Sequence, residues 1–308
     1  MTGEAERERG SERPSLPARL GAWVGARVGT VDRRLRGIPA VQGTQSVMDT
    51  YNRAGGGLTA AGLAYGALFA VIPGLLLLAS IAVIVVDSPE ARQRFLDWIV
   101  EQVPPLHDFA KQIVTGLANG ARVGTLIGLV GFIWGASGFY LGLQGAMGRI
   151  FPARRAPDPI WSRVQGILAV AIVVGAILAA FVAGSAVSLV WTLVGPAFDV
   201  LLPVVSPLIA IAGSTLVALA VYELVPNERP AFRAVLPAAV LAGIVMGLLT
   251  SLFGLLAPLL VGGLAGLGVL ASVFVALVWF NWVFQVLLLG ASYARLRNDQ
   301  RLAQGAGR

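Results

Sequence analysis

Long apolar stretches separated by short polar or basic segments occupy most of this chain. Six of them are long enough to cross a hydrocarbon core of about 30 Å, which takes about 20 helical residues each. They cover residues 58–86, 123–147, 164–194, 203–225, 234–260 and 264–293. The pattern predicts an all-α, polytopic membrane protein with a six-helix membrane domain over residues 58–294.

Two segments of different character precede the first stretch. Residues 1–15 are polar and mixed in charge, which predicts a disordered tail. Residues 16–57 contain apolar positions that recur every three or four residues, with arginines on the other faces. This pattern is typical of a basic amphipathic helix, which either lies on an anionic membrane surface or packs beneath the bundle.

The segments after the first and last stretches complete the domain organisation. Residues 87–122 carry two short amphipathic patterns separated by Pro104 and Pro105, which predict a helical lid or collar on the outer surface. Residues 295–308 form a polar, basic tail.

The basic residues are distributed unequally between the two sides of the predicted bundle. All but four of the 23 lie on one side, and the four exceptions are Arg92, Arg94, Lys111 and Arg122. The positive-inside rule therefore predicts that both termini are cytoplasmic. The net charge of +7 then reflects membrane topology, and we expect no nucleic-acid partner.

Composition excludes most familiar catalytic chemistry. Of the 308 residues 56% are hydrophobic and 13% charged, there is no cysteine, and His107 is the single histidine. A Cys/His metal cluster and a histidine triad cannot be built from this chain, and no phosphate-binding glycine motif occurs. We expect a non-enzymatic protein without a cofactor or metal. Its expected partner is the lipid bilayer, with a lipid or envelope precursor as a candidate substrate.

Glycines recur at spacings of three or four along the second stretch, so that one face of the helix carries no side chains. The glycines are Gly124, Gly128, Gly131, Gly135, Gly138, Gly142, Gly145 and Gly148. Such a face predicts close packing against another helix, with a sliding or gating surface as the alternative. In the first stretch, Pro73 is a candidate hinge or a merely structural bend.

A few polar side chains interrupt the apolar stretches. Asn281 and Gln285 lie one helical turn apart, and Ser292 continues their face. Gln144 and Tyr140 lie beside the glycine face of the second stretch. These side chains either form hydrogen bonds between helices or line a path for a substrate.

Two charged residues lie at the predicted cytoplasmic side. Arg149 follows the second stretch, and Glu223 is the main carboxylate within a stretch. We expect Glu223 to pair with an arginine of a cytoplasmic loop, such as Arg229 or Arg233, with a coupling role as the alternative.

Four blocks of sequence together resemble the YihY/BrkB family of six-span bacterial inner-membrane proteins, over roughly residues 45–295. They are "LAYGALFAVIPGLLLLASI" (63–81), "WGASGFYLGLQGAMGRIF" (134–151), "VYELVPNERPAFRAVLPAAV" (221–240) and "VWFNWVFQVLLLGASYARLR" (278–297), the last being most similar to the YhjD-like branch. Two positions depart from the family pattern. Gly148 stands where an Asn is common, and Ser292 where an acidic residue is frequent.

The resemblance implies a multi-pass protein of the bacterial inner membrane linked to envelope integrity. It also implies transport or flipping of a lipid-like or other envelope component, although a non-transporting scaffold that organises the envelope is the alternative. An older ribonuclease label attached to the family finds no acid/base or metal cluster in these residues.

Overall fold

A computed structural model describes the helices that build most of the membrane domain. The described residues are 39–85, 88, 90, 93–95, 97, 121–152, 164, 202–226, 230–263 and 269–306. The chain divides into two compact units, Met1–Val47 and Met48–Arg308. The helix α2, Pro39–Arg53, crosses this boundary.

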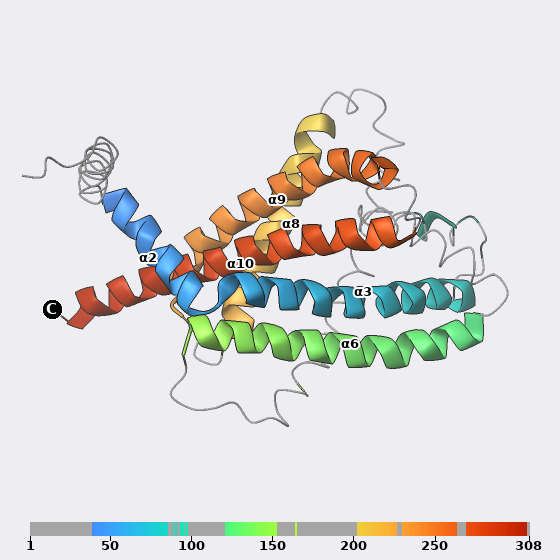
Figure 1. Ribbon diagram of the computed structural model, residues 1–308, viewed down its shortest axis with the longest axis horizontal. Helices are drawn as coiled ribbons and strands as arrows, with labels where there is room; N and C mark the ends of the chain where they lie inside the picture. Colours follow the sequence, from blue (N-terminus) through green and yellow to red (C-terminus); the bar gives the residue numbers. More distant parts are fainter. Residues whose placement is uncertain are drawn as a thin grey trace, which may run out of the picture. The chain divides into compact units, whose positions relative to one another are not determined.

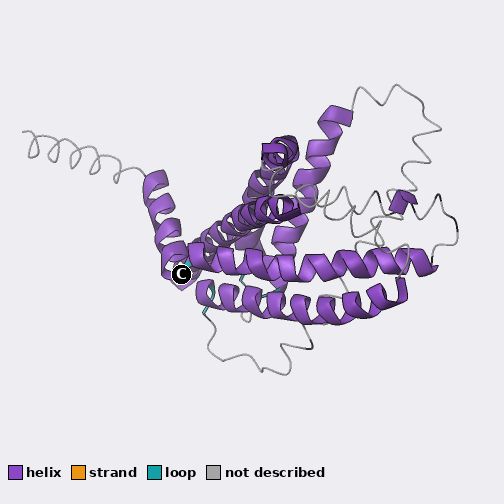
Figure 2. Ribbon diagram, turned by 45° about the vertical axis from the view of Figure 1, so that its right-hand side comes forward, coloured by secondary structure: helices purple, strands orange, loops and turns teal. Residues whose placement is uncertain are grey.

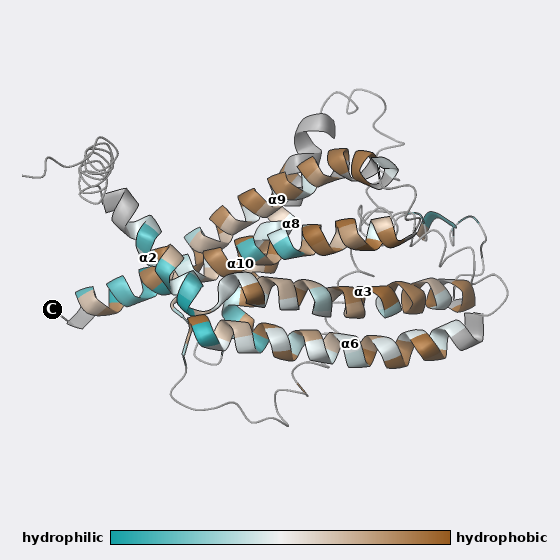
Figure 3. Cartoon of the chain, viewed as in Figure 1, coloured by the Kyte–Doolittle hydropathy of each residue, from teal (hydrophilic) through white to brown (hydrophobic). Residues whose placement is uncertain are grey.

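Every regular element in the described part of the chain is an α-helix (Figures 1 and 2). After α2 come five long helices: α3 (Gly56–Val85), α6 (Ala121–Ile150), α8 (Leu202–Leu224), α9 (Phe232–Gly263) and α10 (Val269–Ala306). Most residues along these helices are apolar, as the hydropathy colouring shows (Figure 3). An all-helical membrane protein is therefore what the sequence encodes.

Four of these helices are long and apolar enough to cross a membrane. The candidate spans are Gly56–Ile81, Gly124–Ile150, Phe232–Phe253 and Leu270–Gln304, and α8 contributes a shorter apolar stretch, Ile211–Leu224. The predicted span over 164–194 lies outside the described residues except for Val164. Six spans thus stay a prediction.

Other expected features also fall where the structure is not described. They are the disordered tail over 1–15, the amphipathic helix over 16–38, and most of the outer loop over 87–122, including His107.

The long helices pack as two pairs joined by α10. The first pair is α3 with α6, which run antiparallel, and the second is α8 with α9 (Figure 1). Helix α10 contacts both α3 and α9, and its buried apolar side chains form one continuous core with those of α3, α6, α8 and α9. The core therefore lies along α10.

A tight turn leads from α2 into α3. Gly55 has a positive φ of 65°, a conformation that glycine adopts without a steric penalty. The Tyr51 ring lies directly over Gly56, where a Cβ would collide with it, and burial raises the pKa of the Tyr51 hydroxyl above its ordinary value. The first span thus begins in an ordered turn.

Along the half of the α3–α6 pair that contains the C-terminal part of α3, glycines allow the two backbones to approach closely. A Cβ at Gly128 would lie 2.8 Å from the Leu77 nitrogen, and one at Gly135 would collide with the Phe69 carbonyl oxygen. A Cβ at Gly131 would lie 3.0 Å from Pro73 Cβ, inside an α3 that continues through this proline. At these three positions of α6, only glycine fits without displacing atoms of α3.

Candidate functional site

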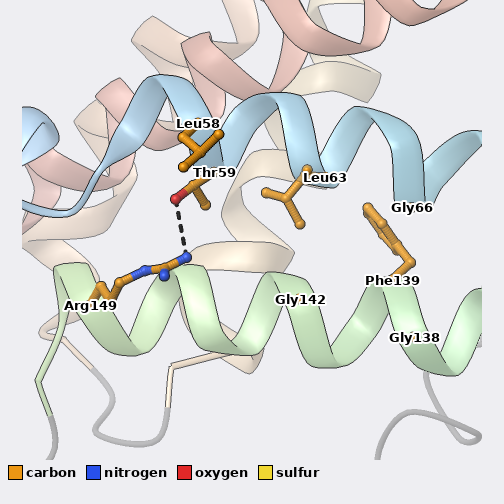
Figure 4. A pocket seen from close by; sticks show the side chains of 9 residues that line it. Leu58, Thr59, Leu63, Gly66, Gly138, Phe139, Gly142 and Arg149 are labelled. Atoms are coloured by element: carbon orange, nitrogen blue, oxygen red, sulfur yellow. Dashed lines mark hydrogen bonds between the residues drawn. The ribbon is translucent and has the colours of Figure 1, made fainter.

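The close approach of α3 and α6 ends after Gly135, and a groove opens between them (Figure 4). A Cβ at Gly138 would meet nothing within 4 Å, and one at Gly142 would only touch Leu63 at 3.5 Å. The groove has a volume of about 340 Å³. It is lined by Leu58, Thr59, Gly62, Leu63, Gly66, Gly138, Phe139, Gly142 and Arg149.

Most of this groove is apolar. Glycines from both helices expose backbone along its length, and the side chains of Leu58, Leu63 and Phe139 form its walls (Figure 4). Leu58 is 85% exposed, although it lies within a candidate span. Such a surface is suited to contact with lipid chains rather than with water.

One end of the groove is cationic. Arg149, in the last turn of α6, donates from Nη2 to the Thr59 hydroxyl oxygen at 3.0 Å (Figure 4). Thr59 lies in the first turns of α3 and donates to the Ala54 carbonyl at 3.5 Å. No carboxylate lines the groove, and none in the described part of the chain pairs with Arg149. The guanidinium charge therefore faces the groove uncompensated by these neighbours.

A second set of polar groups lies inside the bundle, on α8 and α10. Glu223 Oε1, Trp279 Nε1 and Asn281 Oδ1 are buried, and none has a hydrogen-bond partner among the residues that the structure describes. The expected partner Arg229 lies outside those residues, and no ion pair joins Glu223 to Arg233.

Other polar groups of the bundle interior are satisfied locally. Tyr222 donates its hydroxyl to the Leu287 carbonyl at 2.7 Å, which ties α8 to α10. Ser292 donates to the Leu288 carbonyl of its own helix at 2.9 Å, as Ser80 does to Leu76 at 2.7 Å. The hydroxyl of Ser292 is therefore already engaged within α10.

The remaining predicted path residues lie on α6 and α10. Gln144 is buried and interacts with another residue, while Tyr140 and Gln285 are half-buried. The ring centroids of Phe139 on α6 and Phe284 on α10 lie 5.5 Å apart. Tyr140 and Gln285 each follow one of these two phenylalanines in the sequence.

The sequence interpretation missed the α3 side of the groove. Gly62 and Gly66 are spaced by four residues, as are Gly138 and Gly142 on α6. This pairing of small-residue spacings in two stretches was the available signal.

The sequence interpretation also missed a close contact at glycines between α8 and α9, the second helix pair. Gly243 and Gly247 of α9 face Thr215 and Ile211 of α8 so closely that a Cβ at either position would collide. Here the signal was a GxxxG spacing in an apolar helix.

Comparison with known proteins gives one match. The model of the family described as Virulence factor BrkB matches residues 47–308. No curated protein and no solved structure matches the chain. The match includes all five long helices and both sets of polar groups.

Proposed function

The chain belongs to the Virulence factor BrkB family, and from this premise we propose that it moves a lipid-like or other amphiphilic envelope component across the bacterial inner membrane. In this proposal both termini are cytoplasmic, and the protein carries out no covalent chemistry. Asn281 and Glu223 contact the polar part of the cargo, with Gln285, Gln144 and Tyr140 as further path residues.

One observation carries the proposal: polar atoms are buried within α8 and α10 without hydrogen-bond partners in the described structure. Such an atom costs about 1–3 kcal/mol, and an ionised one more. In a purely structural bundle these atoms would lower stability without any compensating gain. A cargo with hydroxyl or phosphate groups would supply the missing hydrogen-bond partners while it passes. Polar groups inside membrane spans mark substrate paths for this reason.

Asn281→Leu tests the proposal because leucine has a similar size and no polar group. The wild type, reconstituted in liposomes, is expected to transfer a fluorescently labelled phosphatidylglycerol between leaflets, measured by dithionite quenching. The variant is expected to lose at least about tenfold of this rate, the equivalent of one lost hydrogen bond to a polar cargo. Its thermal stability is expected to stay equal or to rise, because an unpaired polar atom is removed.

Ser251→Ala is the matched control. Ser251 lies on α9 and donates to the Gly247 carbonyl of its own helix at 3.0 Å, so its removal leaves the path untouched. A wild type that moves neither the labelled lipid nor a lipid-linked envelope precursor would refute the proposal. A variant that transports at the wild-type rate would remove Asn281 from the path.

A different observation favours a scaffold as the second candidate function. Glycines fix both helix pairs at close range, α3 on α6 and α8 on α9, which suits a rigid assembly. If this function is the right one, crosslinking in cells recovers a stable protein partner while the reconstituted protein moves no probe.

A further inference from the structure

The groove between α3 and α6 is built differently from the closely packed half of the same interface. Where the helices touch, a Cβ at Gly128 or Gly135 would collide with α3. In the groove, a Cβ at Gly138 would meet no atom of α3 within 4 Å, so packing between the two helices does not require glycine at this position. A helical glycine costs about 0.5–1 kcal/mol relative to alanine in water. The space at this end is therefore available to something other than α3.

The dimensions of the groove match one leaflet of a bilayer. The stretch of α6 from Gly138 to Arg149 is about 16 Å long, at a rise of about 1.5 Å per residue. This is close to half of a hydrocarbon core of about 30 Å. Arg149 lies at the C-terminal end of one candidate span and Thr59 near the N-terminal end of another, and their hydrogen bond joins these two ends. In a bilayer that these spans cross, the cationic end of the groove would therefore lie at the membrane surface. An acyl chain that begins at the surface would reach the end of the groove near the bilayer centre.

The charge at the surface end selects for an anion. Arginine presents five N–H donors in a planar fork, and the contact with Thr59 engages Nη2. A phosphate accepts two parallel bonds from such a fork. The positive end of the α3 dipole lies at the same place and has the same preference.

We infer that this groove binds an anionic phospholipid, whose phosphate contacts the Arg149 guanidinium that Thr59 positions, and whose acyl chain lies over Gly138, Gly142 and Gly62. The occupant is a membrane lipid because the walls are apolar and lie within candidate spans. The inference is independent of transport, since a lipid bound here serves a flippase and a scaffold equally.

Native mass spectrometry of the full-length protein, titrated with phosphatidylglycerol or phosphatidylcholine in detergent, measures the binding. The wild type is expected to prefer phosphatidylglycerol by about tenfold or more, the size of a charge-assisted hydrogen bond. Arg149→Ala is expected to abolish this preference. Arg53→Ala is the control, because Arg53 is an exposed arginine at the end of α2 that does not line the groove.

A second pair of variants tests the acyl-chain part of the site. Gly142→Leu is expected to fill the groove and weaken both lipids by about tenfold, the transfer value of two or so methylenes. Gly145→Leu is its control, because a Cβ there also meets nothing within 4 Å but Gly145 does not line the groove. If Gly142→Leu fails to fold, the Arg149 and Arg53 variants decide.

Four results would overturn the inference. The first three are equal affinity of the wild type for the two lipids, an unchanged preference in Arg149→Ala, and an equal loss in the control variants, and the fourth comes from a competition experiment. Glycerophosphoglycerol, the headgroup without acyl chains, is included as a competitor. Displacement of the lipid by equimolar headgroup would show an anion site that does not use the apolar groove.

Discussion

At the scale of single residues, the same amino acid on one helix has opposite roles according to what faces it. Gly135 lies against the Phe69 carbonyl oxygen, and Gly138, about one turn later, faces open space. The first glycine is required by packing between helices, whereas the second leaves a groove empty. A sequence pattern that groups them together cannot separate these roles.

This contrast predicts unequal effects of alanine at the two positions. Gly135→Ala is expected to lower stability by about 1–3 kcal/mol, because the new methyl group forces the α3 and α6 backbones apart. Gly138→Ala is expected to be neutral or to stabilise by up to about 1 kcal/mol through helix propensity. Thermal unfolding of the purified variants in the same detergent measures both. A Gly138→Ala variant as unstable as Gly135→Ala would show that α6 packs closely along its whole length.

At the scale of elements, α8, α9 and α10 meet at a junction formed by small groups and one hydroxyl. The Tyr222 hydroxyl of α8 reaches the Leu287 carbonyl of α10 at 2.7 Å, passing Gly290. A Cβ at Gly290 would collide with that hydroxyl and lie 2.9 Å from Ala242 Cβ of α9. Glycine at 290 is therefore what allows α8 to bond to α10.

Two variants and their combination test this junction. Tyr222→Phe is expected to cost about 0.6–1.7 kcal/mol, the range of hydrogen bonds between membrane helices. Gly290→Ala is expected to cost more, about 1–3 kcal/mol, because it displaces both neighbours. The double variant is expected to cost less than the sum, because Tyr222→Phe removes the hydroxyl with which the new methyl group collides. Strict additivity in denaturant unfolding would show that the two positions do not interact.

The helices themselves follow from the sequence, and most of their contacts do not. Length and hydropathy place α3, α6 and α9 within a few residues of the predicted stretches, because an apolar run of this length has no other stable state in a bilayer. Helix α10 differs, because it begins at Val269 and continues to Ala306, through most of the polar tail predicted over 295–308. Asn281 was recognisable as an exception in an apolar helix, but whether Oδ1 finds a partner depends on neighbouring helices. The groove likewise depends on where α3 and α6 stop touching, which the spacing of Gly138 and Gly142 alone does not determine.

At the scale of the whole second unit, three hydrogen bonds show which helix ends lie near one another. Arg149 at the end of α6 bonds Thr59 at the start of α3, and the Ala231 nitrogen before α9 donates to Asn298 Oδ1 in the C-terminal half of α10. Helix α8 finishes near this same end of the bundle, because its Tyr222 bonds Leu287. The chain thus leaves α6 at the end of the bundle where α8 finishes, and α8 begins at the other end. The crossing over residues 164–194 lies outside the described residues and stays a prediction.

The absence of cysteine makes this topology directly measurable with single introduced cysteines. Asn52→Cys and Gln304→Cys, exposed positions before α3 and near the end of α10, are expected to react with a membrane-impermeant maleimide only after lysis of spheroplasts. Ser88→Cys, an exposed position beyond α3, is expected to react in intact spheroplasts. The reverse labelling pattern would show that the side richer in basic residues, with both termini, lies outside the cytoplasm. Opposite labelling of positions 52 and 304 would require an odd number of crossings and exclude the six-span topology, and with it the cytoplasmic location of both termini.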